Sequence, residues 1–188
     1  MKLLLASKSP RRRQLLAELG LPIDIVSVDV DEHLDEPLPA CNVAEYLACR
    51  KSDAYPVDHL ADDEVLVTAD TVVVLDGHVL GKPSSRDEAI DMLHSLSGRS
   101  HEVYTGVCLR TSQCKHSFTE QTTVHFASLT DDDIIYYVDH YRPYDKAGAY
   151  GIQEWIGMIG ISRIEGCYYN VMGLPVARLY AALKEVTC

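Results

Sequence analysis

At 188 residues the chain is long enough to form one domain with a sizeable buried core. Its 47% hydrophobic and 24% charged content is typical of a globular protein, and no apolar stretch approaches the length of a membrane span. The formal net charge of −11 disfavours non-specific binding to nucleic acids or anionic membranes, but it leaves room for a small polyanion in a local cationic pocket.

None of the six cysteines stands in a CxxC pair, and no Cys/His cluster has zinc-finger spacing. The apolar run "KLLLA" is too short for a signal-peptide core, and arginines follow it rather than precede it. We therefore expect a cytoplasmic protein whose thiols are reduced.

The first helix is expected to carry cations where its dipole favours acids. Ser9 can cap this helix and Pro10 fits its first position, yet Arg11, Arg12 and Arg13 occupy the first turn. Either this is a solvated basic turn, or an anion such as a phosphate completes the site.

Short apolar runs alternate with helical patterns along the chain, which predicts an α/β fold. Helices are expected over 9–20, 42–55 with Asn42 as its cap, 85–98 with a Ser85–Glu88 capping box, 130–141 with Thr130 as its cap, and 174–186. Strands are expected over 2–6, 22–30, 64–75, 78–81, 101–111 and 116–129, with a turn at Asp76–Gly77. A loop-rich segment is expected over 142–169, and "IEGCYYNVMGLP" is interpreted as a hinge with Tyr168, Tyr169 and Val171 in the core.

Asp70 interrupts the apolar run "VLVTADTVVVL". A buried carboxylate is costly unless it is paired, hydrogen-bonded or holding a metal. The alternative is that Asp70 lies at a strand end or bulge and caps a turn. The neighbouring hydroxyls of Thr68 and Thr71 can anchor a ligand or satisfy backbone groups.

Two glycine-containing loops hold further candidates. In "LGKPSS", Gly81 allows a close backbone approach and Lys82 can meet a phosphate, although a surface lysine in a turn is the commoner case. In "YDKAGAYGIQ", Gly148 and Gly151 predict a tight loop that leads to Gln153. Its carboxamide can bind the imide edge of uracil or thymine, or it can simply brace the loop.

The eight histidines are scattered, and no Ser or Cys stands in a nucleophile motif. This pattern disfavours a hydrolase of the Ser-His-Asp kind. Carboxylates, a metal and cationic side chains are the groups that phosphate chemistry uses.

Taken together, the sequence resembles the Maf family of nucleoside triphosphate pyrophosphatases, also known as septum-formation inhibitors. The matching segments occur in family order over almost the whole chain: "LASKSPRR", "VDE", "TADTVV", "LGKP", "LSGRSHEVYTGV", "YDKAGAYGIQ" and "NVMGLP". The resemblance implies hydrolysis of a nucleoside triphosphate to the monophosphate and pyrophosphate with a divalent cation, Mg²⁺ or Mn²⁺. It also implies one domain over 1–188, in which a mixed, twisted β-sheet is flanked by helices and two lobes clasp the nucleotide.

The string "DKAGAYGIQ" resembles the branch of the family that acts on dTTP and UTP. The resemblance assigns Asp70 as general base, and Glu32 with Asp70 as metal ligands. Arg11, Thr71 and Gln153 match its specificity positions. The implied substrate-binding set is Ser7, Arg11, Arg12, Lys51, Thr71, Lys82 and Gln153. The segment "EWIGMIGISR" departs from a typical member, and no role is assigned to it.

One alternative is a non-catalytic nucleotide sensor that regulates cell division or septum formation. Glu32 and Asp70 argue against a sensor, because binding phosphate alone needs no additional carboxylates. A second alternative is an enzyme directed mainly at modified pyrimidine triphosphates. We expect neither a nucleic-acid nor a membrane partner, and the sequence leaves monomer and homodimer both open.

Overall fold

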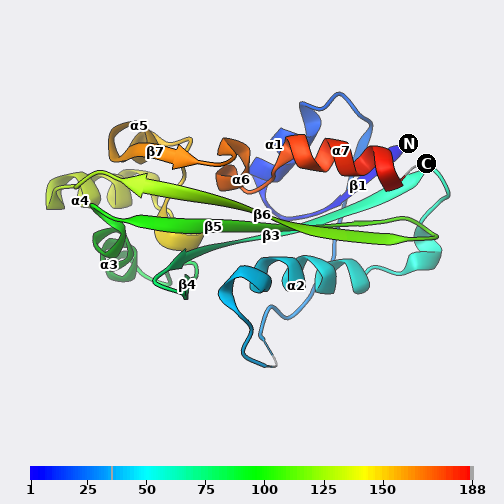
Figure 1. The fold of residues 1–188 in the computed structure, drawn as a ribbon, viewed down its shortest axis with the longest axis horizontal. Helices are drawn as coiled ribbons and strands as arrows, with labels where there is room; N and C mark the ends of the chain where they lie inside the picture. The colour runs from blue at the N-terminus through cyan, green and yellow to red at the C-terminus, as the bar shows by residue number, and fades with distance from the viewer. Residues whose placement is uncertain (35, 187–188) are drawn as a thin grey trace. The chain divides into compact units, whose positions relative to one another are not determined.

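A seven-stranded sheet with the order β2-β1-β3-β5-β6-β7 carries the fold, and β4 pairs with β3 (Figure 1). The computed structural model describes residues 1–34 and 36–186. The chain divides into two compact units. Unit 1 comprises Met1–Asp70, Thr105–Glu120 and the chain from Gly173 onward, and unit 2 comprises Thr71–Tyr104 and Gln121–Met172.

The sheet is mixed. Strand β1 is parallel to both β2 and β3, whereas β4 is antiparallel to β3 and β7 is antiparallel to β6. The strands are β1 (Lys2–Ala6), β2 (Ile23–Val26), β3 (Glu64–Leu75), β4 (His78–Leu80), β5 (Ser100–Arg110), β6 (Lys115–Phe126) and β7 (Ile161–Glu165).

Helices flank this sheet, so the expected mixed α/β fold is confirmed (Figure 1). They are α1 (Pro10–Ala17), α2 (Ala40–Asp53), α3 (Arg86–Leu96), α4 (Asp131–Tyr141), α5 (Trp155–Gly160), α6 (Tyr168–Met172) and α7 (Val176–Val186), with 3-10 turns at Val57–His59 and Ala147–Ala149. Within the described residues, no helix is both long enough and apolar enough to cross a membrane.

Several local signals in the sequence are confirmed. Ser9 caps α1 by accepting a hydrogen bond from the Arg12 amide, and Pro10 opens that helix. Thr130 caps α4 as expected, and the structure adds that Asp133 completes a capping box with it. Asp76 and Gly77 both have positive φ, as a tight two-residue hairpin turn between β3 and β4 requires.

Other boundaries were predicted wrongly. Helix α2 begins at Ala40, so Asn42 lies in its first turn instead of capping it, and its amide donates to the Pro39 carbonyl. Helix α1 ends at Ala17, earlier than expected. Strand β2 ends at Val26, which pairs with Ala6 at the end of the short β1. At α3 half of the expected capping box forms. Ser85 accepts from the Glu88 amide, but the Glu88 carboxylate binds the amide and hydroxyl of Ser84.

The loop-rich prediction for 142–169 is also wrong, because this segment contains α5 and β7. Gly157 and Gly160 weaken the helical pattern of this segment in the sequence, yet close packing requires a glycine at each position. A Cβ on Gly157 would lie 1.8 Å from the Ile152 carbonyl oxygen, and one on Gly160 would lie 2.9 Å from Leu129. The departing segment "EWIGMIGISR" is therefore mainly α5 and the start of β7.

The short helix α6 buries only one narrow face, so the prediction that Tyr168 and Tyr169 lie in the core is wrong. Tyr168 and Tyr169 are 39% and 44% exposed instead of lying in the core, while Val171 is partly buried against the core of unit 2. The buried side chain is Asn170, whose amide donates to the Val103 carbonyl and to the Thr122 hydroxyl.

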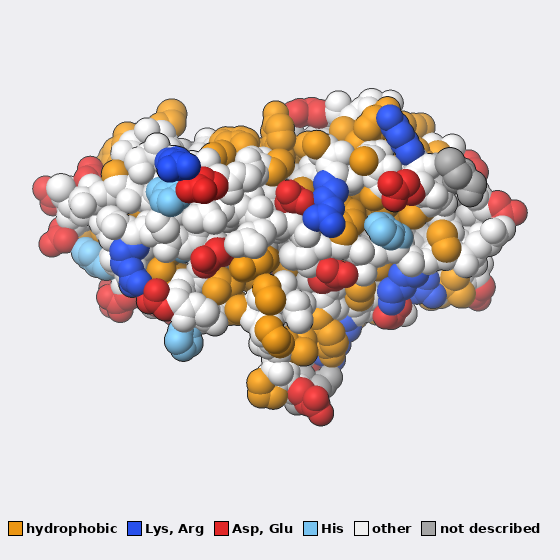
Figure 2. Space-filling model, viewed as in Figure 1, with side chains coloured by type: hydrophobic (Ala, Val, Ile, Leu, Met, Phe, Trp, Pro, Cys, Tyr) orange, Lys and Arg blue, Asp and Glu red, His pale blue; other side chains and the backbone are white. Residues whose placement is uncertain are grey.

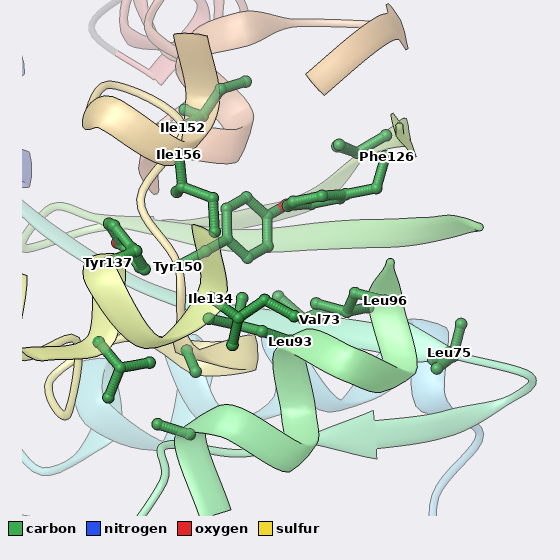
Figure 3. Close-up of a cluster of buried hydrophobic side chains, with 14 of the residues drawn as sticks. Val73, Leu75, Leu93, Leu96, Phe126, Ile134, Tyr137, Tyr150, Ile152 and Ile156 are labelled. Atoms are coloured by element: carbon green, nitrogen blue, oxygen red, sulfur yellow. The ribbon is translucent and has the colours of Figure 1, made fainter. Parts of the chain in front are cut away.

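The core of unit 2 gathers side chains from β3, α3, α4 and the segment around 150 (Figure 3). The Tyr150 ring packs edge-on against Phe126, with centroids 5.1 Å apart. The labelled members of this cluster are Val73, Leu75, Leu93, Leu96, Phe126, Ile134, Tyr137, Tyr150, Ile152 and Ile156. This packing fixes the loop that leads to Gln153.

In unit 1, α2 lies unusually close to the sheet. A Cβ added to Gly106 of β5 would stand 2.2 Å from the Glu45 backbone nitrogen and 2.3 Å from the Ala44 carbonyl carbon. The buried Thr68 hydroxyl of β3 donates to the Ala48 carbonyl at 2.7 Å. Glycine at 106 therefore permits a backbone-to-backbone contact that any side chain would block.

We predict that Gly106→Ala destabilises the fold by about 1–3 kcal/mol or more, because the added methyl group meets backbone atoms that cannot rotate away. Urea unfolding followed by circular dichroism measures the change. Gly81→Ala is the matched control, because nothing lies within 4 Å of its added Cβ. Equal unfolding midpoints for the two variants would contradict the close approach of α2.

Candidate functional site

In unit 1, Lys51 joins two carboxylates that are distant in sequence. Its Nζ lies 2.6 Å from Asp70 Oδ1 and 2.7 Å from Glu32 Oε1. The side chains of Lys51 and Asp70 are 16% and 14% exposed, whereas Glu32 is 50% exposed. An ammonium between two carboxylates makes a compact polar centre that reaches solvent through Glu32.

Asp70 lies in the middle of β3, which continues without a break to Leu75. Of the two alternatives to a functional carboxylate, a strand end or a bulge, the strand end is therefore wrong. A carboxylate at this point of an apolar strand is tolerated because Lys51 of α2 pairs with it. The pairing depends on the close packing of α2 on the sheet, which local sequence patterns do not report.

Glu32 belongs to the segment between β2 and α2, and two hydrogen bonds hold its neighbour His33. The Arg50 guanidinium donates to the His33 carbonyl at 2.5 Å, and the His33 amide donates to Asp31 at 2.9 Å. Arg50 directly precedes Lys51 on α2, so one helical turn both anchors this segment and meets the Glu32 carboxylate.

Ser7 follows the carboxyl end of β1, beside the strand that carries Asp70. The register pairs Leu5 with Val67, and continuing it sets Ser7 level with Ala69. The Ser7 hydroxyl accepts a hydrogen bond from the Ser9 amide at 3.2 Å, immediately before α1. Carboxyl ends of parallel strands followed by a helix N-terminus are where α/β proteins commonly bind phosphates.

Arg12 points back into unit 1. Its Nε donates to the Gly173 carbonyl at 2.8 Å, so the "NVMGLP" segment supplies an anchor for this guanidinium. Burial lowers the pKa of Arg12, while the charges of Asp70 and Glu32 oppose that shift and Arg11 adds to it. Arg12 therefore interacts electrostatically with the same carboxylates as Lys51. Arg13, by contrast, is exposed.

Unit 2 contains the other predicted residues, Thr71, Lys82 and Gln153. The Gly148 amide donates to the Gly81 carbonyl at 3.0 Å, so the turn bearing Lys82 is joined to the loop that leads to Gln153. Lys82 is exposed. Among the described residues no hydrogen-bond partner meets Gln153 Oε1, although this oxygen is buried.

A polar network behind the Gln153 loop was not anticipated from the sequence. The Tyr137 hydroxyl donates to Glu154 Oε2 and accepts from the Gly151 amide at 3.0 Å. Lys146, with only 9% of its side chain exposed, lies 3.1 Å from Glu154 Oε1 and 2.7 Å from Asp145. The available signal in the sequence was Lys146 and Glu154, which flank the glycine-containing loop. This signal does not reveal Tyr137, because Tyr137 lies on a separate helix, α4.

The described residues contain no cluster of three or more His, Cys, Asp or Glu side chains that could hold a metal ion. The polar centre offers two carboxylates, Glu32 and Asp70, with Lys51 between them. Mg²⁺ commonly uses only one or two protein carboxylates and takes its remaining ligands from water and substrate phosphates.

Residues 2–186 match the family model of Maf-like proteins. The chain belongs to the Maf-like family. Proteins named dTTP/UTP pyrophosphatase from Bacteroides thetaiotaomicron and Phocaeicola vulgatus are each 50% identical to this Maf-like chain over 186 residues, covering 98% of it and 96% of each relative. A protein of the same name from Christiangramia forsetii is 42% identical over 185 residues, which are 98% of this chain and 94% of that protein.

The fold also resembles a solved structure of lower sequence similarity. The Ham1 protein of Staphylococcus aureus superposes on this Maf-like chain with a TM-score of 0.53 at 15% identity, covering 98% of this chain and 99% of that one. The likeness extends over the whole length of both chains and concerns the fold.

We predict that Tyr137→Phe destabilises this Maf-like protein by about 1–3 kcal/mol, because it leaves the Gly151 amide and one Glu154 oxygen without the Tyr137 hydroxyl. Chemical denaturation measures the loss. Tyr136→Phe on the same helix is the control, because Tyr136 is 43% exposed. Equal stability of the two variants would show that the network behind the Gln153 loop contributes little.

Proposed function

We propose that this chain is a nucleoside triphosphate pyrophosphatase that converts dTTP and UTP to the monophosphates and pyrophosphate. The observation that carries the proposal is the Lys51–Asp70–Glu32 centre in a chain that is 50% identical to proteins named dTTP/UTP pyrophosphatase. Two carboxylates beside a cation suit a reaction in which water is activated and phosphate charge is neutralised.

Asp70 is the proposed general base. Lys51 Nζ contacts one oxygen of this carboxylate, Oδ1, and the carboxylate is the group that would accept a proton from an attacking water. Because Glu32 also contacts Lys51 and is half exposed, it lies where a charged ligand can approach Asp70 from solvent. Lys51 then holds both carboxylates in position and contributes positive charge toward the phosphates.

The donor set fits a hard divalent cation, because carboxylate oxygens are the ligands that Mg²⁺ and Mn²⁺ prefer. Glu32 and Asp70 would hold it. When bound, the ion would neutralise charge on the phosphate groups.

The remaining substrate roles are proposals supported by position. Ser7, Arg11 and Arg12 belong to the segment where β1 leads into α1, a common phosphate-binding arrangement. In unit 2, Lys82 is an exposed cation, and Gln153 has a buried carbonyl oxygen without a described partner. We propose that Lys82 binds phosphate and that Arg11, Thr71 and Gln153 determine specificity.

We extend the proposal to one Maf-like domain over 1–188, because the family model covers 2–186. A cytoplasmic location is part of the same proposal and is supported by the five described cysteines, all of which are free thiols. Sedimentation of the purified chain distinguishes a monomer from a homodimer.

We predict that Asp70→Asn retains the fold and lowers kcat for dTTP and UTP by about 10²–10⁴-fold, the usual effect of losing a general base. Pyrophosphate release with Mg²⁺ or Mn²⁺ measures turnover, and orthophosphate release is followed in parallel. Asp91→Asn, an exposed acid of α3, is the control and should retain the activity of the unaltered protein.

Near-normal turnover by a folded Asp70→Asn variant would reject Asp70 as the base. A different result would reject the enzyme itself. If the unaltered protein binds dTTP but releases no pyrophosphate with either metal, the nucleotide-sensor alternative is favoured. Faster turnover of modified pyrimidine triphosphates in the same assay would favour the second alternative.

We predict that Gln153→Leu reduces the preference for UTP over CTP by about ten- to a hundredfold, through a lower kcat/KM for UTP. A carboxamide can pair with an acceptor and the adjacent N–H of the uracil imide, whereas cytosine lacks that N–H. Gln113→Leu, at an exposed turn position, is the matched control. An equal loss on UTP and CTP would instead assign Gln153 to bracing its loop.

A further inference from the structure

A hydrogen bond joins the thiols of Cys49 on α2 and Cys108 on β5 in unit 1. The Thr68 hydroxyl lies 2.7 Å from the Ala48 carbonyl oxygen and 3.5 Å from the Cys108 carbonyl oxygen, so one side chain touches both backbones beside the thiols. This contact brings α2 and β5 together immediately next to the two cysteines.

The spacing along the two elements explains why the thiols meet. Gly106 lies against Glu45 at the close approach of α2. Four helical residues beyond Glu45 advance about 6 Å, and two strand residues beyond Gly106 advance about 6.6 Å. Cys49 therefore sits over Cys108 much as Glu45 sits over Gly106.

The two thiols interact directly. A hydrogen bond from the Cys108 thiol lowers the pKa of Cys49, and burial opposes this effect. Of the charged groups around Cys49, Lys115 of β6 lowers this pKa and Glu45 of α2 raises it. The same hydrogen bond and burial raise the pKa of Cys108. The pair is thus asymmetric, with the negative charge favoured on Cys49.

Only one of the two thiols has access to small molecules. Cys49 is partly exposed and lines an open pocket of ≈ 380 Å³ together with Asn42, Glu45 and Tyr46, which share one face of α2. Cys108 is fully buried behind it. A small oxidant can reach Cys49 from this pocket, while Cys108 can react only with what Cys49 becomes.

We propose that Cys49 is a site of oxidation by hydroperoxides and that Cys108 resolves the product as an intrachain disulfide between α2 and β5. The Cys49 thiolate attacks one peroxide oxygen, which forms a sulfenic acid and, for hydrogen peroxide, releases hydroxide. The Cys108 sulfur then attacks the Cys49 sulfur. The S–S bond forms, the S–O bond breaks, and the thiol proton leaves with the hydroxyl group as water.

Peptide mapping by mass spectrometry tests this proposal on the full-length protein. After a stoichiometric dose of hydrogen peroxide, the unaltered protein should yield a Cys49–Cys108 linked peptide that dithiothreitol reverses. Cys49→Ser should lose this link. In Cys108→Ala, which removes the resolving thiol, a 1,3-diketone probe should label Cys49 at least about tenfold more than in the unaltered protein, because the sulfenic acid persists.

Cys41→Ser is the matched control, because Cys41 lies on the same helix and is exposed. It should retain the full yield of the Cys49–Cys108 link. The proposal is overturned if the unaltered protein accumulates oxidised Cys49 while Cys108 stays a free thiol, if Cys49 links to another cysteine, or if Cys41 is oxidised first. The mapping of the unaltered protein decides the matter even if a variant fails to fold.

Discussion

The ion pairs of Lys51 allow unit 1 to hold the carboxylates of Asp70 and Glu32 at one centre. Asp70 interrupts an apolar strand and Glu32 approaches from a separate segment, yet both end on the same ammonium. Two carboxylates held close together repel each other unless a cation lies between them. The cation converts this repulsion into attraction, and it does so from a mostly buried position where water screens it weakly. A chain with a net charge of −11 thereby keeps an acidic centre inside a folded unit, while charges of both signs are interspersed over the face shown in Figure 2.

The position of Lys51 depends on how closely α2 approaches the sheet. Gly106 has no side chain to keep α2 farther from the sheet. The Thr68 hydroxyl donates a hydrogen bond to the Ala48 carbonyl at this contact. The same approach has two chemical results on one helix. It brings Lys51 to Asp70, and it brings Cys49 to Cys108. A packing constraint at a glycine thus places both an ion-pair centre and a thiol pair.

Unit 2 holds the loop before Gln153 in place through apolar packing and hydrogen bonds. Its apolar cluster surrounds Tyr150, and the hydroxyl of Tyr137 joins α4 to the loop before Gln153 (Figure 3). Gly148 has a φ of +67° and lies against Val73, so this loop also requires glycine for its backbone conformation. Lys146 and Glu154 pair nearby. A loop fixed from several sides can present Gln153 with little conformational freedom, which suits the role in base recognition proposed for this side chain.

The sequence by itself determined the α/β class, the position of β3 and the residue types of the polar centre. It also determined the caps at Ser9 and Thr130 and the hairpin turn at Asp76–Gly77, because each of these depends on residues within one turn. The resemblance to Maf proteins assigned Asp70, Glu32 and Lys51 as site residues. Only the tertiary structure decided that Lys51 joins the two acids, that Asn42 is not a cap, and that "WIGMIGISRIE" forms α5 and β7. These features depend on contacts between segments far apart in the chain, where packing overrides local propensity.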